Sequence, residues 1–436
     1  MMKIEKNLAA PELTSLEESV VNRITADSWF DLVRELIPAG QPAAENPLDP
    51  DFPSGSEEGI AKVVAAKLEA MGLSVQLAAK QKGRPNVIGR LQGTTSEKTL
   101  IVNDHLDTYP AGDPTQWTMT GGNPYNPTVS GDRLYSRGTS DTRGNLACTL
   151  VAVKAIRDAG IKLKGDLMCV YTVDEEKHGT NGAIYLLEEL GIKGDFEITA
   201  EPSGWTEPMG RWGISVAVAH CGNCLVELQT SGVKSHIWRP DSGVNAISNM
   251  VRLISALEKL EFTHTAPGIY GSNKPAACLV RIKGGLPGEM QFTADSCNAV
   301  CAVVGIVPGM TAESVLGDIE ALISRLKAED ANFNATARLF PNSLFVPATE
   351  ELTQEDKPVN AVVSAYQKIL GETPVFYRKN AYCDTIRFSQ HGIPSITFGP
   401  GEDGWPPVNE YIHTAKILAA SRIYALAIMD LLGVEA

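Results

Sequence analysis

Residues 99–110 read TLIVNDHLDTYP, an apolar run that passes directly into a polar segment with one histidine and two aspartates. A short run rich in Leu, Ile and Val is typical of a buried strand. His105 and Asp107 follow this run closely, and functional side chains gather beyond the carboxyl ends of strands in open α/β sheets. The stretch therefore predicts a strand of an α/β sheet and a functional site at the edge of that sheet.

Strand and helix patterns alternate on both sides of this segment. Further strands are predicted at NVIGRL (86–91), LMCVYTV (167–173) and FEITA (196–200), and helices at residues 60–71, 145–159 and 182–190. After residue 341 the same pattern returns, with a helix expected at 358–370. This alternation is typical of an α/β fold in which a mostly parallel sheet is covered by helices on both faces.

The middle of the chain has a different pattern. ISVAVAHCGNCLVELQT (214–230) alternates like one half-exposed antiparallel strand, and helices are expected at 244–260 and 312–328 with strands between and after them. Strand, helix, strand, strand, helix, strand is the order of a ferredoxin-like α+β domain. We therefore expect one domain from residues 1–212 and 341–436, interrupted by a second domain at 213–340.

The composition excludes several classes of protein. A chain of 436 residues suggests two domains, and 43% hydrophobic with 21% charged residues is ordinary for a globular protein. A net charge of −14 disfavours nucleic-acid or anionic-membrane partners, which require clustered Lys and Arg. No apolar run follows the first lysines, and the eight cysteines have no framework spacing. We expect a cytoplasmic enzyme with no nucleic-acid or membrane partner.

Cys221 and Cys224 form a CxxC beside His220. A structural zinc site of this kind usually needs a second pair of ligands, and no such pair lies in range. We interpret the two cysteines as residues of a packed strand.

Acidic residues follow two other predicted strands and precede one predicted helix. Glu175 and Glu176 follow the strand at 167–173, Glu201 follows the strand at 196–200, and Asp141 lies just before the helix at 145–159. Each has a simpler interpretation, such as a solvated loop, a turn or a helix cap. Carboxylates gathered with His105 at one edge would repel one another unless a cation neutralised them. The pattern therefore predicts a site for a divalent metal such as zinc, manganese or cobalt.

Four motifs carry a resemblance to a known family. HLDTYP (105–110), SRGTSDTRG (136–144), VDEEKHGTNGA (173–183) and AEPS (200–203) resemble, in order and spacing, those of the aminoacylase/carboxypeptidase G metallopeptidase family. That family includes acetylornithine deacetylase and succinyl-diaminopimelate desuccinylase. SGVKSHIWRPDSGVNAI (231–247), FGPG (398–401) and NEYI (409–412) extend the resemblance over nearly the whole chain. It implies a zinc-peptidase-like catalytic domain, a lid and dimerisation domain, a homodimer or higher homo-oligomer, and hydrolysis of a C–N bond in a small carboxylate-bearing substrate.

The resemblance also implies roles for individual residues. His105 and Glu201 look like ligands of one metal, Asp141 like a bridging carboxylate, Glu176 like a ligand of a second metal, and Glu175 like the general base. 

Residues around this set would support it. Asp107 resembles the carboxylate that holds the His105 ring in its ligating tautomer. His236 resembles a lid histidine that reaches the reacting carbonyl across a dimer interface, and Asn245 belongs to the same lid segment. Arg378 and Arg387 are candidates for binding a substrate carboxylate.

Three positions depart from the family pattern. Pro406 stands where the family has its last histidine ligand, Gly305 stands where it has a lid arginine, and Asn103-Asp104 replaces the usual glycine before the first motif. His413 could replace the missing ligand only after a local rearrangement. Since proline cannot bind a metal, we expect one dominant metal site, and three protein ligands are enough to activate water.

These departures favour a substrate outside the usual range of the family. The specific expectation is deamination of 5-nitroanthranilate to 5-nitrosalicylate, an activity of one branch of the family. Alternatives are an N-acylamino acid deacylase, a dipeptidase or carboxypeptidase, and a non-catalytic binding protein; Glu175 beside a complete ligand set argues against the last. Aromatic residues near the motifs could line a flat pocket: Trp117, Trp205, Trp212, Trp238, Tyr382 and Trp405.

Overall fold

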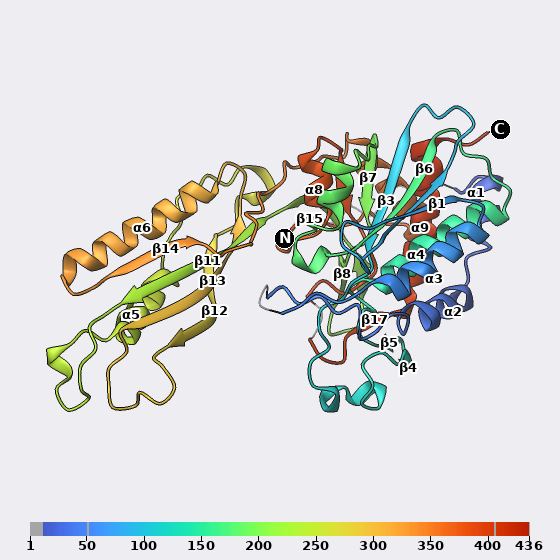
Figure 1. Cartoon of the computed structure of the whole chain (residues 1–436). Coiled ribbons are helices and arrows are strands. Elements are labelled where there is room, and N and C mark those ends of the chain that lie inside the picture. The colour runs from blue at the N-terminus through green and yellow to red at the C-terminus, as the bar shows by residue number, and fades with distance from the viewer. Residues whose placement is uncertain (1–11, 50–51, 405–406, 436) are drawn as a thin grey trace. The chain divides into compact units, whose positions relative to one another are not determined.

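A computed structural model describes residues 12–49, 52–404 and 407–435 (Figure 1). The chain forms two compact units: unit 1 comprises Met1–Val218, Leu352–Tyr377 and Cys383–Ala436, and unit 2 comprises Ala219–Glu351 and Arg378–Tyr382. The first change of unit comes later than the expected residue 213. The reason is that β10 (Val216–His220) pairs with β16 (Ser395–Thr397) and so belongs to the large sheet of unit 1.

An eight-stranded sheet runs through unit 1 in the order β1-β2-β6-β3-β7-β16-β10-β15. Its central strands β6, β3, β7 and β16 are parallel to one another, whereas β1, β2 and β10 join antiparallel. The prediction of a mostly parallel α/β sheet is confirmed. The strands not yet bounded are β1 (Ser74–Ala78), β2 (Asn86–Leu91), β3 (Thr99–His105), β6 (Asp166–Thr172), β7 (Phe196–Thr199) and β15 (Phe376–Lys379).

Helices of unit 1 cover both faces of this sheet. On one face, Ile101 of β3 and Val170 of β6 pack with Leu186 and with Phe388 of α8. On the other face, the Tyr171 hydroxyl lies 3.1 Å from the Thr149 hydroxyl of α4, and α4 in turn packs against α9. The helices are α1 (Ser15–Val21), α2 (Ala26–Leu36), α3 (Glu58–Ala70), α4 (Arg143–Asp158), α7 (Lys357–Leu370), α8 (Thr385–Gln390) and α9 (Thr414–Leu432).

Local sequence explains most of these boundaries. Ile60, Val64 and Leu68 form the buried stripe of α3, and Gly72 follows its C-terminus with a φ of 83°, which favours glycine. The helix predicted at 182–190 is instead a short π-helix, Tyr185–Glu189. Two small sheets complete unit 1: β17 (Tyr411–His413), β5 (Arg133–Tyr135) and β4 (Thr128–Ser130), and β8 (Gly204–Thr206) with β9 (Trp212–Ile214).

Unit 2 is a four-stranded antiparallel sheet in the order β12-β13-β11-β14 with two helices, α5 and α6. Its chain order, β11-α5-β12-β13-α6-β14, is the ferredoxin-like order predicted from the sequence. Met250, Leu253, Ile319 and Leu322 of the helices pack with Val226 in one apolar core. The elements are β11 (Gly222–Ser231), α5 (Ala246–Leu257), β12 (Ala276–Gly284), β13 (Ser296–Ile306), α6 (Ala312–Glu329) and β14 (Ala335–Leu339).

The single strand predicted at 214–230 is in fact two strands in two different sheets. β10 ends at His220 and β11 begins at Gly222, so only Cys221 separates them. A Cβ at Gly222 would lie 2.0 Å from the Val346 carbonyl oxygen, so only glycine fits at this crossing. Cys221 and Cys224 are free, buried cysteines of the unit 2 core, as the packed-strand interpretation expects.

Within the part of the chain that the structure describes, no helix has both the length and the apolar character needed to cross a membrane.

Candidate metal centre

Three parallel neighbouring strands end at the site. His105 is the last residue of β3 and pairs with Thr172, the last residue of β6. The chain beyond β6 enters a 3-10 turn that begins at Glu175, and Glu201 follows the end of β7 by two residues. Adjacent parallel strands end on the same side of a sheet, so these side chains are delivered to one place.

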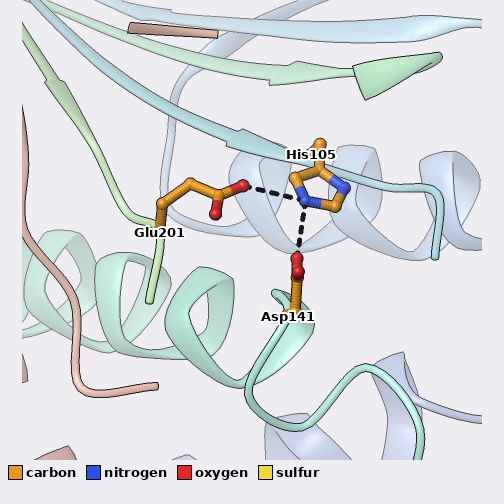
Figure 2. Close-up of side chains that lie close together, drawn as sticks. All are labelled: His105, Asp141 and Glu201. Carbon is orange, nitrogen blue, oxygen red and sulfur yellow. Dashed lines mark hydrogen bonds and ion pairs between the residues drawn. The ribbon is translucent and has the colours of Figure 1, made fainter. Parts of the chain in front are cut away.

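Figure 2 shows His105, Asp141 and Glu201 with their side chains turned toward one another. The Nε2 atom of His105 lies 2.9 Å from Glu201 Oε1 and 3.1 Å from Asp141 Oδ1. One ligand atom from each residue lies within 4.8 Å of the others. We call these three residues the ligand triad.

Asp141 reaches the triad from the segment before α4. The N-cap of that helix is Thr142, and so the alternative role of Asp141 as the helix cap does not apply. 

Glu175 and Glu176 add negative charge beside the triad. Glu175 Oε2 lies 3.8 Å from His105 Nε2. Burial, followed by the charges of neighbouring carboxylates, raises the pKa of both glutamates well above the ordinary value. The Glu176 Oε1 atom is buried and has no hydrogen-bond partner among the described residues. 

The histidine responds to the same charge. Burial opposes protonation of His105, but the negative charge of Glu175 and hydrogen bonds to the other carboxylates outweigh it and raise the pKa of His105 well above its ordinary value. A buried group of carboxylates and one imidazole is a donor set that zinc, manganese and cobalt accept. The residues therefore fit a divalent metal held by the triad.

Asp107 fixes the orientation of the His105 ring. His105 Nδ1 lies 3.1 Å from the Asp107 carbonyl oxygen and 3.4 Å from its Oδ1, so Nδ1 is the nitrogen positioned to donate. In a neutral ring held in this way, Nε2 carries the lone pair that would bind a metal. The Asp107 carboxylate is itself held by Asn46 Nδ2 at 2.8 Å and by the backbone N–H groups of Glu175 and Glu176 at 3.3 and 3.2 Å.

An arginine lies near the site but pairs with residues outside the triad. Arg84 is 1% exposed, bonds both carboxylate oxygens of Glu57, and donates to Asp174 Oδ1 at 2.7 Å. Asp174 has a φ of 67° and also accepts from Asn46 at 3.2 Å and from the backbone N–H of Asn181 at 3.0 Å. These bonds hold the turn that carries Glu175.

Four other predicted residues lie elsewhere in the two units. In unit 2, His236 is exposed with its ring 5.9 Å from that of Trp238, and Asn245 Oδ1 caps α5 by accepting from the Ile247 N–H at 2.9 Å. Arg378, also in unit 2, donates to Asn380. In unit 1, Arg387 is buried on α8 and donates to the His178 carbonyl oxygen at 3.2 Å. Their roles toward a substrate stay predictions.

The departures from the family pattern have partial structural explanations. Pro406, like Trp405, lies outside the described residues. His413 ends β17 and pairs with Asp132 at 2.8 Å, in the small sheet and not in the triad. Gly305 has a φ of 72°, a left-handed backbone that an arginine would adopt only with strain.

The aromatic residues predicted as pocket walls are scattered among other contacts. Trp117 is buried with the Arg137 guanidinium 5.1 Å from its ring centre, and Trp205 lies under Arg211 at 5.5 Å. Trp212 contacts His413, and Trp238 is 85% exposed. The hydroxyl-bearing Tyr382 belongs to unit 2.

Comparison with known proteins decides the family. The sequence profile of Peptidase family M20/M25/M40 matches residues 101–430, which is well over half of the chain. The chain belongs to this family. It is therefore a hydrolase that acts on amide C–N bonds, as the resemblance in the motifs implied.

Two curated members of the family are similar over almost their whole length. An N-formyl-4-amino-5-aminomethyl-2-methylpyrimidine deformylase of Bacillus subtilis is 28% identical over 435 residues, covering 94% of this chain and 96% of that protein. An acetylornithine deacetylase of Proteus mirabilis is 26% identical over 410 residues, covering 90% and 94%. Human carnosine dipeptidase 1 shares the fold, with a TM-score of 0.73 at 16% identity over 97% of this chain and 100% of that structure.

The motifs did not identify four polar residues around the site: Asn46, Arg84, Arg137 and Glu410. Two of them lay in quoted motifs, Arg137 in SRGTSDTRG (136–144) and Glu410 in NEYI (409–412), but neither was given a role. Asn46 and Arg84 act through hydrogen bonds between distant parts of the chain, which spacing in the sequence does not reveal.

Proposed function

We propose that this protein is a metal-dependent deacylase that removes a small acyl group, such as formyl or acetyl, from the nitrogen of a small molecule. The observation that carries the proposal is the position of the Glu175 carboxylate. Its Oε2 atom lies 3.8 Å from His105 Nε2, the ring nitrogen that faces the other two triad residues. The two curated relatives support it, because one is named as a deformylase and the other as a deacetylase.

His105, Asp141 and Glu201 would hold one zinc, manganese or cobalt ion. When bound, such an ion polarises a carbonyl group and makes water acidic near neutral pH. Glu175 accepts the proton of the attacking water at its carboxylate and returns it to the departing nitrogen. Burial and the neighbouring carboxylates raise the pKa of Glu175, and a raised pKa makes its carboxylate a stronger proton acceptor.

Four further predictions from the sequence belong to the proposal. The names of the relatives reported above give no support to the deamination of 5-nitroanthranilate. A homodimer formed through unit 2, with His236 acting in the partner's site, stays a prediction, and so does a cytoplasmic location. Glu176 is proposed as a weak second ligand or as a group that orients Glu175.

One assay distinguishes these substrates. Metal-free protein is loaded separately with Mn²⁺, Zn²⁺ and Co²⁺ and incubated with N-formyl and N-acetyl amines, N-acylamino acids, dipeptides and 5-nitroanthranilate. We expect metal-dependent release of formate or acetate. Turnover of dipeptides alone would show that the protein is a peptidase and not a deacylase. Turnover of 5-nitroanthranilate alone would show that it is an aminohydrolase. Metal binding without turnover of any substrate would favour a binding protein.

A further inference from the structure

The carboxylate of Glu410 lies in a buried cradle beside the triad. Glu410 is 0% exposed, and each of its oxygens accepts two hydrogen bonds. Oε2 accepts from Arg137 Nη1 at 2.7 Å and from the Gly138 N–H at 3.0 Å. Oε1 accepts from the backbone N–H groups of Ser140 and Asp141 at 2.6 and 3.0 Å.

Three of these four donors are backbone groups of one short segment, and the last of them belongs to a triad residue. A carboxylate that receives several backbone N–H groups fixes the path of the chain that supplies them, and charge-assisted bonds of this kind are about twice as strong as neutral ones. The segment at residues 137–141 is consequently wrapped around Glu410. The direction in which the Asp141 side chain leaves the backbone depends on this contact.

We propose that Glu410 is the positioning residue for the Asp141 ligand, and that Arg137 serves it by balancing its buried charge. A buried carboxylate without a partner would be costly, and it would add to the negative charge already gathered at the triad. Arg137 removes both difficulties, since its guanidinium pairs with Glu410 and also donates to the Pro407 carbonyl oxygen at 2.8 Å.

The neighbouring residue performs a similar task for another loop. Asn409 has a φ of 55°, and its Oδ1 accepts from the Met119 N–H at 3.0 Å while its Nδ2 lies 3.2 Å from the Thr118 hydroxyl. The dipeptide Asn409-Glu410 therefore binds two separate segments of unit 1. It lies three residues after Pro406, so the segment that has no histidine ligand at that position still supports the site through Glu410.

A second buried ion pair in unit 1 provides a matched control. Glu402 is 6% exposed and pairs with Lys416 at 2.6 Å, but its carboxylate accepts from Thr206 and not from the backbone of residues 137–141. Replacement of either glutamate by glutamine removes one buried charge from an ion pair. Only the replacement at 410 alters the cradle of Asp141.

The test compares Mn²⁺ binding by metal-free wild type, Glu410→Gln and Glu402→Gln, measured by equilibrium dialysis, with thermal unfolding of the same metal-free samples. We expect Glu410→Gln to raise the Kd for Mn²⁺ at least about tenfold, the effect typical of groups that orient a ligand, and Glu402→Gln to leave it within about twofold. Activity of Glu410→Gln should return as Mn²⁺ is raised. Unchanged Mn²⁺ affinity in folded Glu410→Gln would overturn the proposal.

Two milder variants apply if Glu410→Gln does not fold. Arg137→Lys keeps a cation and all three backbone bonds, and should bind Mn²⁺ within about threefold of wild type. Glu410→Asp is too short to meet all four donors, and should bind about tenfold more weakly. Equal losses in both variants would show that the ion pair, and not the cradle, matters. The inference rests on the proposed metal role of Asp141; wild type that binds no divalent metal would refute that role, whereas equal binding by wild type and Glu410→Gln would refute this inference alone.

Discussion

His105 in unit 1 and His220 in unit 2 are both 1% exposed, but they differ in the charges around them. Carboxylates surround His105 and raise its pKa well above the ordinary value, although burial opposes this. Burial, together with the positive charge of Lys379, lowers the pKa of His220 to about 3. Burial favours the neutral ring in both places, so the neighbouring charges decide the outcome. The direction of the pKa shift of a buried histidine therefore distinguishes the two surroundings. It is upward beside the carboxylates around His105 and downward beside the cation at His220.

The strongest test of the unit 1 site is Glu175→Gln. The amide cannot accept the proton of water, so kcat should fall by about 10³-fold, within the range typical of general bases. Mn²⁺ content, measured by metal analysis, should stay within about twofold of wild type. Glu188→Gln, at an exposed position, serves as the control. Full activity of Glu175→Gln would show that the carboxylate only shapes the charge around His105.

Metal should stabilise unit 1 through the triad. A ligand that binds only the folded protein at about 100 times its Kd adds about 2.7 kcal/mol to the free energy of unfolding. Denaturant unfolding with and without Mn²⁺ should show this gain in wild type and in His220→Gln, and not in Glu201→Ala. A gain that survives in Glu201→Ala would place the ion outside the triad.

Asp107→Asn tests how the His105 ring is held. The variant keeps the backbone carbonyl contact at Nδ1 but loses the carboxylate that faces the ring and receives Asn46. Affinity for Mn²⁺ should fall between about tenfold and a hundredfold, as for other groups that orient a histidine ligand. Calorimetric titration measures the change, and Asp113→Asn, in a fully exposed turn, is the control. Wild-type affinity in Asp107→Asn would mean that the carbonyl alone sets the tautomer.

Acid should lower the stability of the fold through the buried ring of His220. Its folded pKa of about 3 lies below the ordinary 6.5, so the unfolded chain takes up this proton first as the pH falls. The stability that it contributes is complete above pH 6.5 and is lost toward pH 3, by about 2 kcal/mol between pH 7 and pH 5. Denaturant unfolding at both pH values should show a smaller loss in His220→Gln. The control is His264→Gln, a substitution at an exposed position, which should lose as much stability as wild type. If His220→Gln also loses as much stability as these two proteins, the assignment is wrong.

The sequence predicted what depends on local pattern. Apolar runs located β3, β6 and β7, and the acids that follow them, together with Asp141 before α4, identified the residues that the structure gathers around His105. It failed where one pattern covers two environments: residues 214–230 alternate without a break, yet the chain changes sheet at Cys221. Alternation reports which face of a strand is buried, but not which sheet the strand joins.

The hydrogen bonds that hold the residues around the site could not be predicted from local sequence patterns either. Arg84 contacts Asp174, 90 positions further along the chain, and Asn46 contacts Asp107 across a separation of 61. A lone asparagine or arginine has many possible partners, and only the folded chain selects one. The predicted domain limits differed from the two units for a similar reason, since residues 378–382 join unit 2 from a distant part of the chain.

The position of Glu410 after all three triad residues in the chain sets an order of events during synthesis. Every residue of the triad leaves the ribosome more than 200 residues before this carboxylate does. A nascent or truncated chain that ends before residue 410 carries all three proposed metal ligands but lacks the carboxylate that accepts from the Asp141 backbone. If Glu410 has the proposed role, capture of the ion in its final geometry waits until residue 410 has been made, and truncation before that residue would weaken metal binding although all three proposed ligands remain.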